Sequence, residues 1–347
     1  MFQHAFHQFV FTTVVLALMS AIPTGELEEH ASCMISSVLS ASSILSCSSV
    51  TISAFTVPSR SMTIIMAGDI TFAKTSSDRP LFTINGDDIT FNGMGYSFDG
   101  NSAKYWDGEG TNGSVDKPHP FLKFKGSGTY SNFTVLNSPA QAISIGNSDS
   151  LVFDSITIHR IPLIWHDGDD DDLGHNTDGF DVSANDVTIQ NSVVKNQDDC
   201  IAINDGSNII FKNNKCLGSH GILIGSISSG KSVTDVTISG NTVMDSMYGF
   251  RIKVKASATS MSVSSITYSG NTLSGINEYG VLITQSYPDD EGTPGTGGPI
   301  LDINFTRSTT TIKVGDDAKH LAVDCGACSG TWDFSKLKIT GRSAGNS

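Results

Sequence analysis

Carboxylates, a histidine and two cations recur at similar intervals in the middle of the chain. They occur in four motifs, namely Asp178 in NTDGFD, Asp198 and Asp199 in NQDDCIAIN, His220 in GSHGILIGS, and Arg251 with Lys253 in GFRIKVK. The steps are 21 residues from Asp178 to Asp199, 21 from Asp199 to His220, and 31 from His220 to Arg251. If a repeating coil has about this length, these side chains form one row along one face of the molecule.

Three carboxylates about one coil apart raise one another's pKa, so one can keep a proton while another accepts a proton from water. Hydrolysis of a glycosidic bond needs this division of roles, and inverting enzymes place acid and base about 6.5–9.5 Å apart. The two cations could hold a carboxylate on the sugar. Taken singly, an Asp-Asp pair is often part of a solvated turn, and Arg-Ile-Lys is often the outward face of a strand. The recurrence of these residues at the same position in successive coils disfavours both interpretations.

The elements that position these residues are short strands. Apolar and polar residues alternate and then end in Asn or Gly, as in NDVTIQNS from residue 185, SNIIFKNN from 207, TDVTISGN from 234 and SSITYSGN from 264. This is the pattern of strands bounded by turns. The unit recurs after about 20 to 30 residues, as in solenoids, without the consensus of leucine-rich or helical repeats. We therefore predict an all-β fold, a parallel β-helix in one elongated domain, with aligned Asn residues at its turns.

Composition and charge exclude some partners. The 347 residues carry 21 Lys and Arg against 35 Asp and Glu, which gives a net charge of −14. A chain this acidic repels the negatively charged backbone of a nucleic acid and cannot bind it non-specifically, so we expect no nucleic acid partner.

The amino terminus resembles a secretory signal. Residues 9–22 are uncharged, which is too short for a membrane span but typical of a signal peptide; the alternative is a buried strand. We predict removal of residues 1–21, with a cleavage site as late as about residue 25 left open. The mature protein would then be extracellular and free of the membrane.

Cysteine usage agrees with secretion. The six cysteines form three local couples, Cys33 with Cys47, Cys200 with Cys216, and Cys325 with Cys328. This spacing suggests three short-loop disulfides, although the last couple could be a redox or metal pair. Sequons for glycosylation lie at Asn112, Asn132 and Asn304.

In this order, the four motifs resemble those of the polygalacturonases, family 28 of the glycoside hydrolases, and most closely the secreted fungal endopolygalacturonases. The similarity extends through KYWDGEGTNG (104–113), LNSPAQAISI (136–145) and INEYGVLITQSY (276–287). It covers most of residues 31–347, which we take as the catalytic domain.

The resemblance implies a role for each matching position. Asp198 would be the general acid, Asp178 and Asp199 would activate water, His220 would support the acid, and Asn176, Arg251, Lys253 and Tyr287 would contact the substrate. It further implies a right-handed β-helix, inversion at the anomeric carbon, no metal and no cofactor. The Cys200–Cys216 and Cys33–Cys47 couples match family disulfides. The implied substrate is polygalacturonate or pectin, and we expect a monomer.

One segment departs from the family pattern. The apolar stretch IPLIW (161–165) stands shortly before Asp178 and could crowd the cleft. Three other activities stay open. An exo-acting polygalacturonase or rhamnogalacturonan hydrolase stays open because the loops that would close the cleft cannot be placed from the sequence. A calcium-dependent pectate lyase comes next, and then an inactive β-helix that binds cell walls, which only the apolar stretch favours.

Overall fold

The computed structural model describes residues 12–16, 32–34, 49–53, 62–66, 68–147, 149–159 and 174–341. The apolar stretch 161–165, Cys47 and most of the expected signal peptide lie outside these residues. Strand β1 (Thr12–Leu16) falls within the expected signal peptide and pairs with β4 (Met62–Met66). The boundary at residue 21 stays a prediction.

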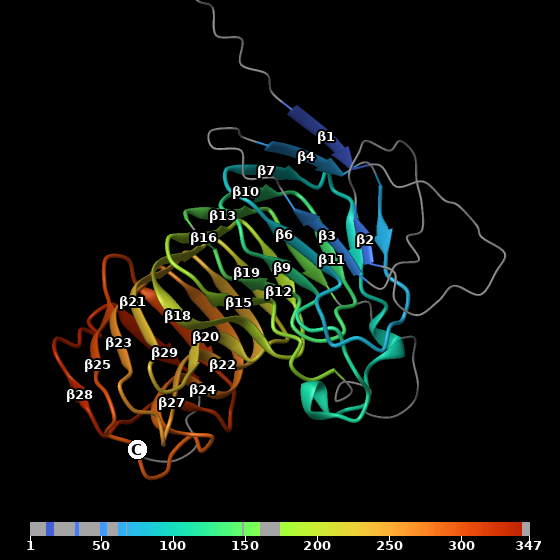
Figure 1. Ribbon diagram of the computed structural model, residues 1–347. Helices are drawn as coiled ribbons and strands as arrows, with labels where there is room; N and C mark the ends of the chain where they lie inside the picture. The colour runs from blue at the N-terminus through green and yellow to red at the C-terminus, as the bar shows by residue number, and fades with distance from the viewer. Residues whose placement is uncertain are drawn as a thin grey trace, which may run out of the picture.

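The described strands form three parallel ladders that run along the molecule (Figure 1). The first ladder contains β1, β4, β7 (Ile89–Asn92), β10 (Gly128–Ser131), β13 (Leu151–Asp154), β16 (Val187–Gln190), the second half of β18 (Asp199–Lys212), β21 (Ser232–Ser239), β23 (Ser262–Ser269), β25 (Ile300–Phe305) and β28 (Cys328–Ser329).

The second ladder carries the motifs of interest. It contains β2 (Ser32–Met34), β3 (Ser49–Ser53), β6 (Phe82–Asn85), β9 (Leu122–Phe124), β12 (Ile143–Ile145), β15 (Phe180–Ser183), the first half of β18, β20 (Gly221–Ile227), the second halves of β22 (Thr242–Lys255) and β24 (Thr272–Tyr287), and β27 (Lys319–Asp324).

The third ladder completes each coil. It contains β5 (Ile70–Thr71), β8 (Ser97–Asp99), β11 (Thr134–Leu136), β14 (Thr157–His159), β17 (Val193–Lys195), β19 (Lys215–Leu217), the first halves of β22 and β24, β26 (Thr310–Val314) and β29 (Leu337–Thr340). Two short 3-10 helices, η1 (Ser102–Lys104) and η2 (Gly110–Asn112), lie in one connection.

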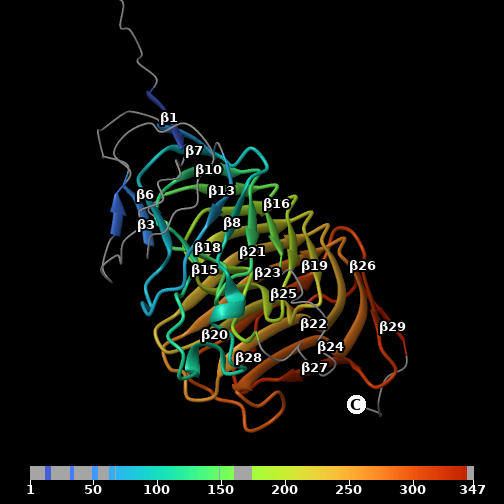
Figure 2. The ribbon, with the colours of Figure 1, turned by 90° about the vertical axis from the view of Figure 1, so that its right-hand side faces the viewer.

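The prediction of one elongated parallel β-helix is confirmed. The coils stack in chain order from β1 at one end toward the C terminus at the other (Figure 2), and the solenoid is right-handed. None of the helices in the described ranges has the length and apolar character needed to cross a membrane.

Alternation along each strand buries one row of side chains per ladder. Ile203, Ile224, Ile252 and Ile283 align on consecutive strands of the second ladder and are at most 1% exposed. Aromatic rings fill the core nearer the amino end, where Tyr130 stacks on Phe153 with centroids 5.4 Å apart. This stack of coils holds the site residues at fixed heights and angles.

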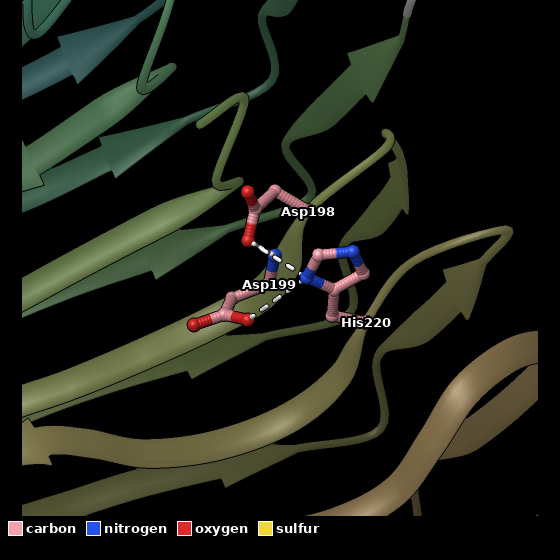
Figure 3. Close-up of side chains that lie close together, drawn as sticks. All are labelled: Asp198, Asp199 and His220. Atoms are coloured by element: carbon pink, nitrogen blue, oxygen red, sulfur yellow. Dashed lines mark hydrogen bonds and ion pairs between the residues drawn. The ribbon is translucent and has the colours of Figure 1, made fainter. Parts of the chain in front are cut away.

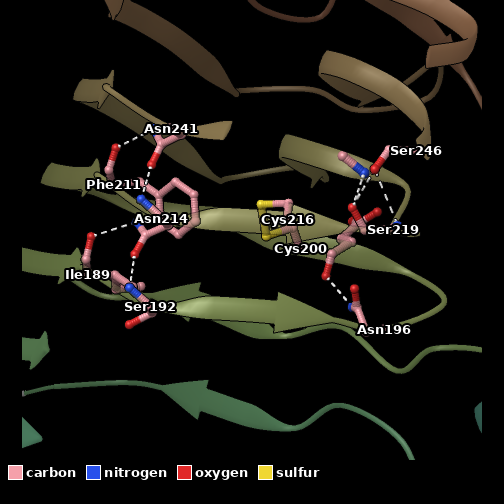
Figure 4. Close-up of a disulfide and its surroundings, with 12 residues drawn as sticks. Ile189, Ser192, Asn196, Cys200, Phe211, Asn214, Cys216, Ser219, Asn241 and Ser246 are labelled. Carbon is pink, nitrogen blue, oxygen red and sulfur yellow. Dashed lines mark hydrogen bonds between the residues drawn. A yellow bond between two sulfur atoms is a disulfide. The ribbon is translucent and has the colours of Figure 1, made fainter. Parts of the chain in front are cut away.

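An asparagine row runs inside the turns between the first and third ladders (Figure 4). Asn241 Oδ1 accepts the backbone N–H of Asn214 at 2.9 Å, and its Nδ2 donates to the Phe211 carbonyl at 2.9 Å. Asn271 repeats the arrangement one coil further on, because its Oδ1 accepts the N–H of Asn241 at 2.9 Å. The predicted alignment of Asn residues is thus confirmed here.

Asn241→Ala should lower the free energy of unfolding by about 2–6 kcal/mol, since two buried backbone groups would lose their partners at about 1–3 kcal/mol each. Asn241 is 1% exposed, so water cannot replace the amide. Denaturant titration measures the change. The exposed Asn277 is the control, and its alanine variant should stay within about 0.5 kcal/mol. Equal stability of the two variants would show that the row contributes little.

Candidate active site

Neighbouring coils bring Asp178, Asp198, Asp199 and His220 together. The N–H of Gly179, next to Asp178, donates to the Asp199 carbonyl at 2.8 Å, and the N–H of His220 donates to the Asp198 carbonyl at 2.8 Å. These residues therefore occupy the same edge of the second ladder on three successive coils, as the spacing predicted.

The predicted phase of Arg251 is wrong. Tyr248, not Arg251, follows His220 on the next coil, and its N–H donates to the His220 carbonyl at 3.1 Å. Arg251 pairs with Leu223 instead. Arg251 consequently lies three residues further along the strand than the row of carboxylates.

His220 contacts both members of the Asp-Asp pair (Figure 3). Its Nδ1 lies 3.1 Å from Asp198 Oδ1 and 3.8 Å from Asp199 Oδ1. The imidazole is about one-third exposed, whereas the Asp199 side chain is 1% exposed. His220 thus covers a buried carboxylate and hydrogen-bonds to a more open one.

Lys253 lies inside the carboxylate cluster. Its Nζ is 2.9 Å from Asp199 Oδ2, and both side chains are buried. A buried pair of this kind is costly to break from one side only, because the remaining charge loses its partner. The sequence comparison suggested only a contact between Lys253 and substrate, so the ion pair with Asp199 is an addition.

Asp198 accepts two further hydrogen bonds from the backbone. The N–H of Asn176 donates to Asp198 Oδ2 at 3.0 Å, and the N–H of Asp199 donates to Asp198 Oδ1 at 2.8 Å. The side-chain Oδ1 of Asn176 in turn accepts the N–H and the hydroxyl of Thr111, each at 3.1 Å. Thr111 of η2 therefore holds the side chain of Asn176 in place, and the backbone N–H of Asn176 holds the carboxylate of Asp198.

Burial sets the pKa of the two inner carboxyls. It raises the pKa of Asp178 well above its usual value, and the charges of Asp198 and Asp199 raise it further. Burial also raises the pKa of Asp199, to about 6, although Lys253 opposes the shift. Either carboxyl is consequently a better proton acceptor than an ordinary aspartate.

Asp198 and His220 behave as one unit. Burial raises the pKa of Asp198, but the hydrogen bond and charge of His220 and the charge of Lys253 outweigh it and bring the pKa to about 2. For His220 burial lowers the pKa, whereas Asp198 and Asp199 raise it above the usual value. One proton is therefore held between Nδ1 and Oδ1, and the pair loses it only at a higher pH than a free histidine.

The guanidinium of Arg251 contacts the faces of two tyrosine rings. Its guanidinium carbon is 4.4 Å from the Tyr248 centroid and 5.4 Å from the Tyr287 centroid. Its Nη2 pairs with Asp290, and its buried Nε has no hydrogen-bond partner among the described residues. Tyr287 also reaches Lys253, with Nζ 5.7 Å from the ring centroid, so the structure brings these three predicted substrate contacts together.

Sequence reasoning did not single out Asp181, Asn204, Thr111 or Asp290. Asp181 Oδ1 accepts Asn204 Nδ2 at 2.7 Å, and burial raises the pKa of Asp181 to about 6. Both residues lie within the quoted NTDGFD and NQDDCIAIN motifs, and Thr111 lies in KYWDGEGTNG. Motif membership was a usable signal for these three, but nothing in the sequence pointed to Asp290.

Donor atoms of Asp198, Asp199 and His220 lie within 4.8 Å of one another, close enough to hold a metal ion. The chemistry of the set argues against it. Lys253 already neutralises Asp199, and His220 Nδ1 is engaged by Asp198. A cation here would have to compete with an ammonium group and break the His220–Asp198 hydrogen bond.

Two predicted disulfides are present. Cys200, the residue after Asp199, bonds to Cys216 (Figure 4), and Cys325 bonds to Cys328. The pairing of Cys33 with Cys47 involves a residue outside the described ranges and stays a prediction.

Glycosylation also stays a prediction. Asn132 is exposed, whereas Asn304 Oδ1 accepts the N–H of Asp333 at 3.0 Å and is half-buried. Asn112 ends the helix η2.

A cavity of about 500 Å³ opens beside His220. Its walls come from the turns of successive coils, including Gln197, Ser219, Asp245 and Glu278. The cavity shares His220 with the site, whereas the three aspartates, Arg251 and Lys253 do not line it.

The model of glycosyl hydrolases family 28 matches residues 38–347. The chain belongs to this family. Family 28 membership agrees with the resemblance that the four motifs carry, and the match includes every candidate active-site residue.

Relatives in family 28 are similar over most of their length. The chain is 42% identical over 315 residues to an endo-polygalacturonase of Sclerotinia sclerotiorum, covering 85% of this chain and 80% of the relative. It is 40% identical to endopolygalacturonase A of Aspergillus niger, covering 94% and 91%. Among solved structures, endopolygalacturonase I of Stereum purpureum in complex with two galacturonates matches with a TM-score of 0.77 and 60% identity, covering 86% of this chain and 91% of that one.

Proposed function

We propose that this protein is a secreted, monomeric polygalacturonase that hydrolyses α-1,4-galacturonosyl linkages within polygalacturonate. The observation that carries the proposal is the cluster of three aspartates with His220 and Lys253 on the second ladder. Family 28 membership and the endopolygalacturonase relatives support the substrate and internal cleavage.

In the proposed reaction, Asp198 protonates the glycosidic oxygen as the bond to the anomeric carbon breaks. The proton comes from the Asp198–His220 pair. When bound sugar excludes water, the charged form of the pair loses solvation, and the neutral pair with the proton on Asp198 is favoured. His220 thereby keeps Asp198 supplied with a proton.

Water attacks the anomeric carbon from the opposite face and inverts it. Asp178 or Asp199 takes the proton that this water loses, and the raised pKa of both carboxyls suits them to accept it. Lys253 offsets part of the effect of burial and so favours the ionised form of Asp199. After product release, proton exchange with solvent restores the starting state.

Substrate recognition uses the cations. We assign the carboxylate of a galacturonate unit to Arg251, with Lys253 and the ring of Tyr287 beside it. Asn176 is assigned a further contact through its side-chain Nδ2, because Thr111 occupies its Oδ1. In a chain with a net charge of −14, these local cations would attract an anionic substrate that the rest of the protein repels.

The rate should be greatest on the acid side of neutrality. Asp178 and Asp199 both have raised pKa values, and at least one of them must be ionised to act as the base, so activity is lost as pH falls below these values. The His220–Asp198 pair must be protonated, so activity is lost as pH rises through its raised pKa. A plot of kcat/KM against pH checks both limbs. A rate that still increases above pH 8 would contradict the assignment.

Digestion of polygalacturonate with and without a chelator tests the function. We expect new reducing ends, no ultraviolet absorbance from unsaturated products, no effect of chelator, and early mid-length oligomers. Release of single sugars from the start would indicate exo action. Unsaturated products that disappear with chelator would indicate a pectate lyase, and a folded protein without any product would favour a wall-binding role.

A further inference from the structure

Asp290 occupies the position where Arg251 would hold a substrate carboxylate. It stands in the loop directly after β24, three residues beyond Tyr287. One oxygen, Oδ1, pairs with Arg251 Nη2, and the other, Oδ2, accepts the hydroxyl of Tyr248 at 2.8 Å. Arg251 and Tyr248 thus form a site for one carboxylate, and a carboxylate of the chain itself fills it.

The next residue anchors the same loop. Glu291 Oε1 accepts Tyr279 OH at 3.0 Å and pairs with Lys319 Nζ at 2.8 Å. Tyr248 and Tyr279 are neighbours on successive coils, with ring centroids 6.0 Å apart. Because the Glu291 pair is exposed on both sides, it contributes little energy, whereas Arg251 is buried and its ion pair is less screened.

The Asp290 side chain can nevertheless move away from Arg251 into solvent. The Asp290 side chain is 29% exposed, so solvent reaches it, whereas the Arg251 side chain is 8% exposed and contacts the Tyr248 and Tyr287 rings. No described residue reaches the buried Nε of Arg251, so Asp290 satisfies only part of the guanidinium. A galacturonate carboxylate and Asp290 are the same chemical group and compete for the same N–H of Nη2.

We propose that Asp290 is a built-in competitor that sets the affinity for galacturonate by occupying Arg251 until the substrate displaces it. The inference rests on the proposed function, which assigns Arg251 to a galacturonate carboxylate. If the competent, Asp290-free state is a minor fraction, the apparent dissociation constant is the intrinsic one divided by that fraction. Removing the competitor should therefore tighten binding.

Calorimetric titration with hexagalacturonate tests this in the Asp198→Asn background, which should bind the oligomer while turning it over at least about a hundredfold more slowly. Asp290→Ala should lower the dissociation constant about threefold to tenfold, as expected if the competent fraction is about one-tenth to one-third. Asp290→Asn keeps the shape of the side chain and should lower it less but in the same direction. The control is Asp289→Asn, which removes one charge from the same loop and should leave binding within about twofold, since its carboxylate makes no hydrogen bond to Arg251.

The outcomes separate the two claims. An unchanged or weaker affinity in both Asp290 variants would overturn the inference and make Asp290 a residue that positions Arg251 for substrate. Equal tightening by Asp289→Asn would also overturn it, because loop charge alone would then explain the effect. Failure of every variant to bind hexagalacturonate would refute the proposed function, and the inference with it.

Discussion

Asp198→Asn should lower kcat on polygalacturonate at least about a hundredfold, with little change in fold. A positioned general acid contributes about 10²–10⁴-fold, and an amide in this position has no acidic proton to deliver. Asn has the shape of Asp, but its single side-chain oxygen can accept only one of the two N–H groups, of Asn176 and Asp199, that Asp198 accepts on separate oxygens, so the fold loses about one hydrogen bond. Steady-state kinetics and thermal unfolding measure the two effects.

Asp205→Asn is the matched control for this variant. Asp205 lies on the same strand β18 and pairs with Lys231 at 2.9 Å, but both side chains are partly exposed. Its kcat should stay within about twofold, because exposed ion pairs contribute little. If Asp198→Asn kept more than about one-hundredth of the wild-type rate, another group would have to be the acid.

Lys253→Met should lower kcat by roughly a hundredfold and move the acid limb of the pH profile to higher pH, as when a general base is lost at the assay pH. Lys253 lowers the pKa of both Asp178 and Asp199, so its removal raises both values. The carboxyls that accept the proton from water then stay protonated over more of the acid range. Profiles of kcat against pH for both enzymes measure the shift.

Lys255→Met serves as the control, since Lys255 is exposed and only two residues further along β22. The resemblance to polygalacturonases alone predicts that loss of Lys253 weakens substrate binding. A higher KM with an unchanged kcat and an unchanged profile would support that role alone. It would show that the ion pair with Asp199 has no effect on the reaction.

The catalytic cluster could be predicted because the coil length is nearly constant where it lies. Phe180 pairs with Ile201 and Ile201 with Ile222, two steps of 21 residues, so residues with that spacing align. The next step, from Ile222 to Phe250, is 28 residues. The 31 residues from His220 to Arg251 are therefore three more than the length of this coil. The alternation pattern alone does not reveal how long each turn is.

Contacts made by irregular segments could not be predicted in the same way. Asp290 reaches Arg251 from a loop without periodic signal, and Thr111 reaches Asn176 across 65 residues from the η2 connection. Such contacts depend on the path of the loop, not on strand register. The ion pair of Lys253 with Asp199 was not predicted for another reason. The resemblance to polygalacturonases assigned Lys253 to the substrate, so no partner within the protein was sought.

The central claim is that water attacks the sugar directly while Asp198 donates the proton and Asp178 or Asp199 accepts one. Proton magnetic resonance of the first reducing ends released from polygalacturonate tests it most directly. The account predicts that the β-anomer forms first from the α-linked chain and then equilibrates slowly. Initial release of the α-anomer would mean a covalent intermediate on one of the carboxylates, and the roles assigned to Asp178 and Asp199 would be wrong.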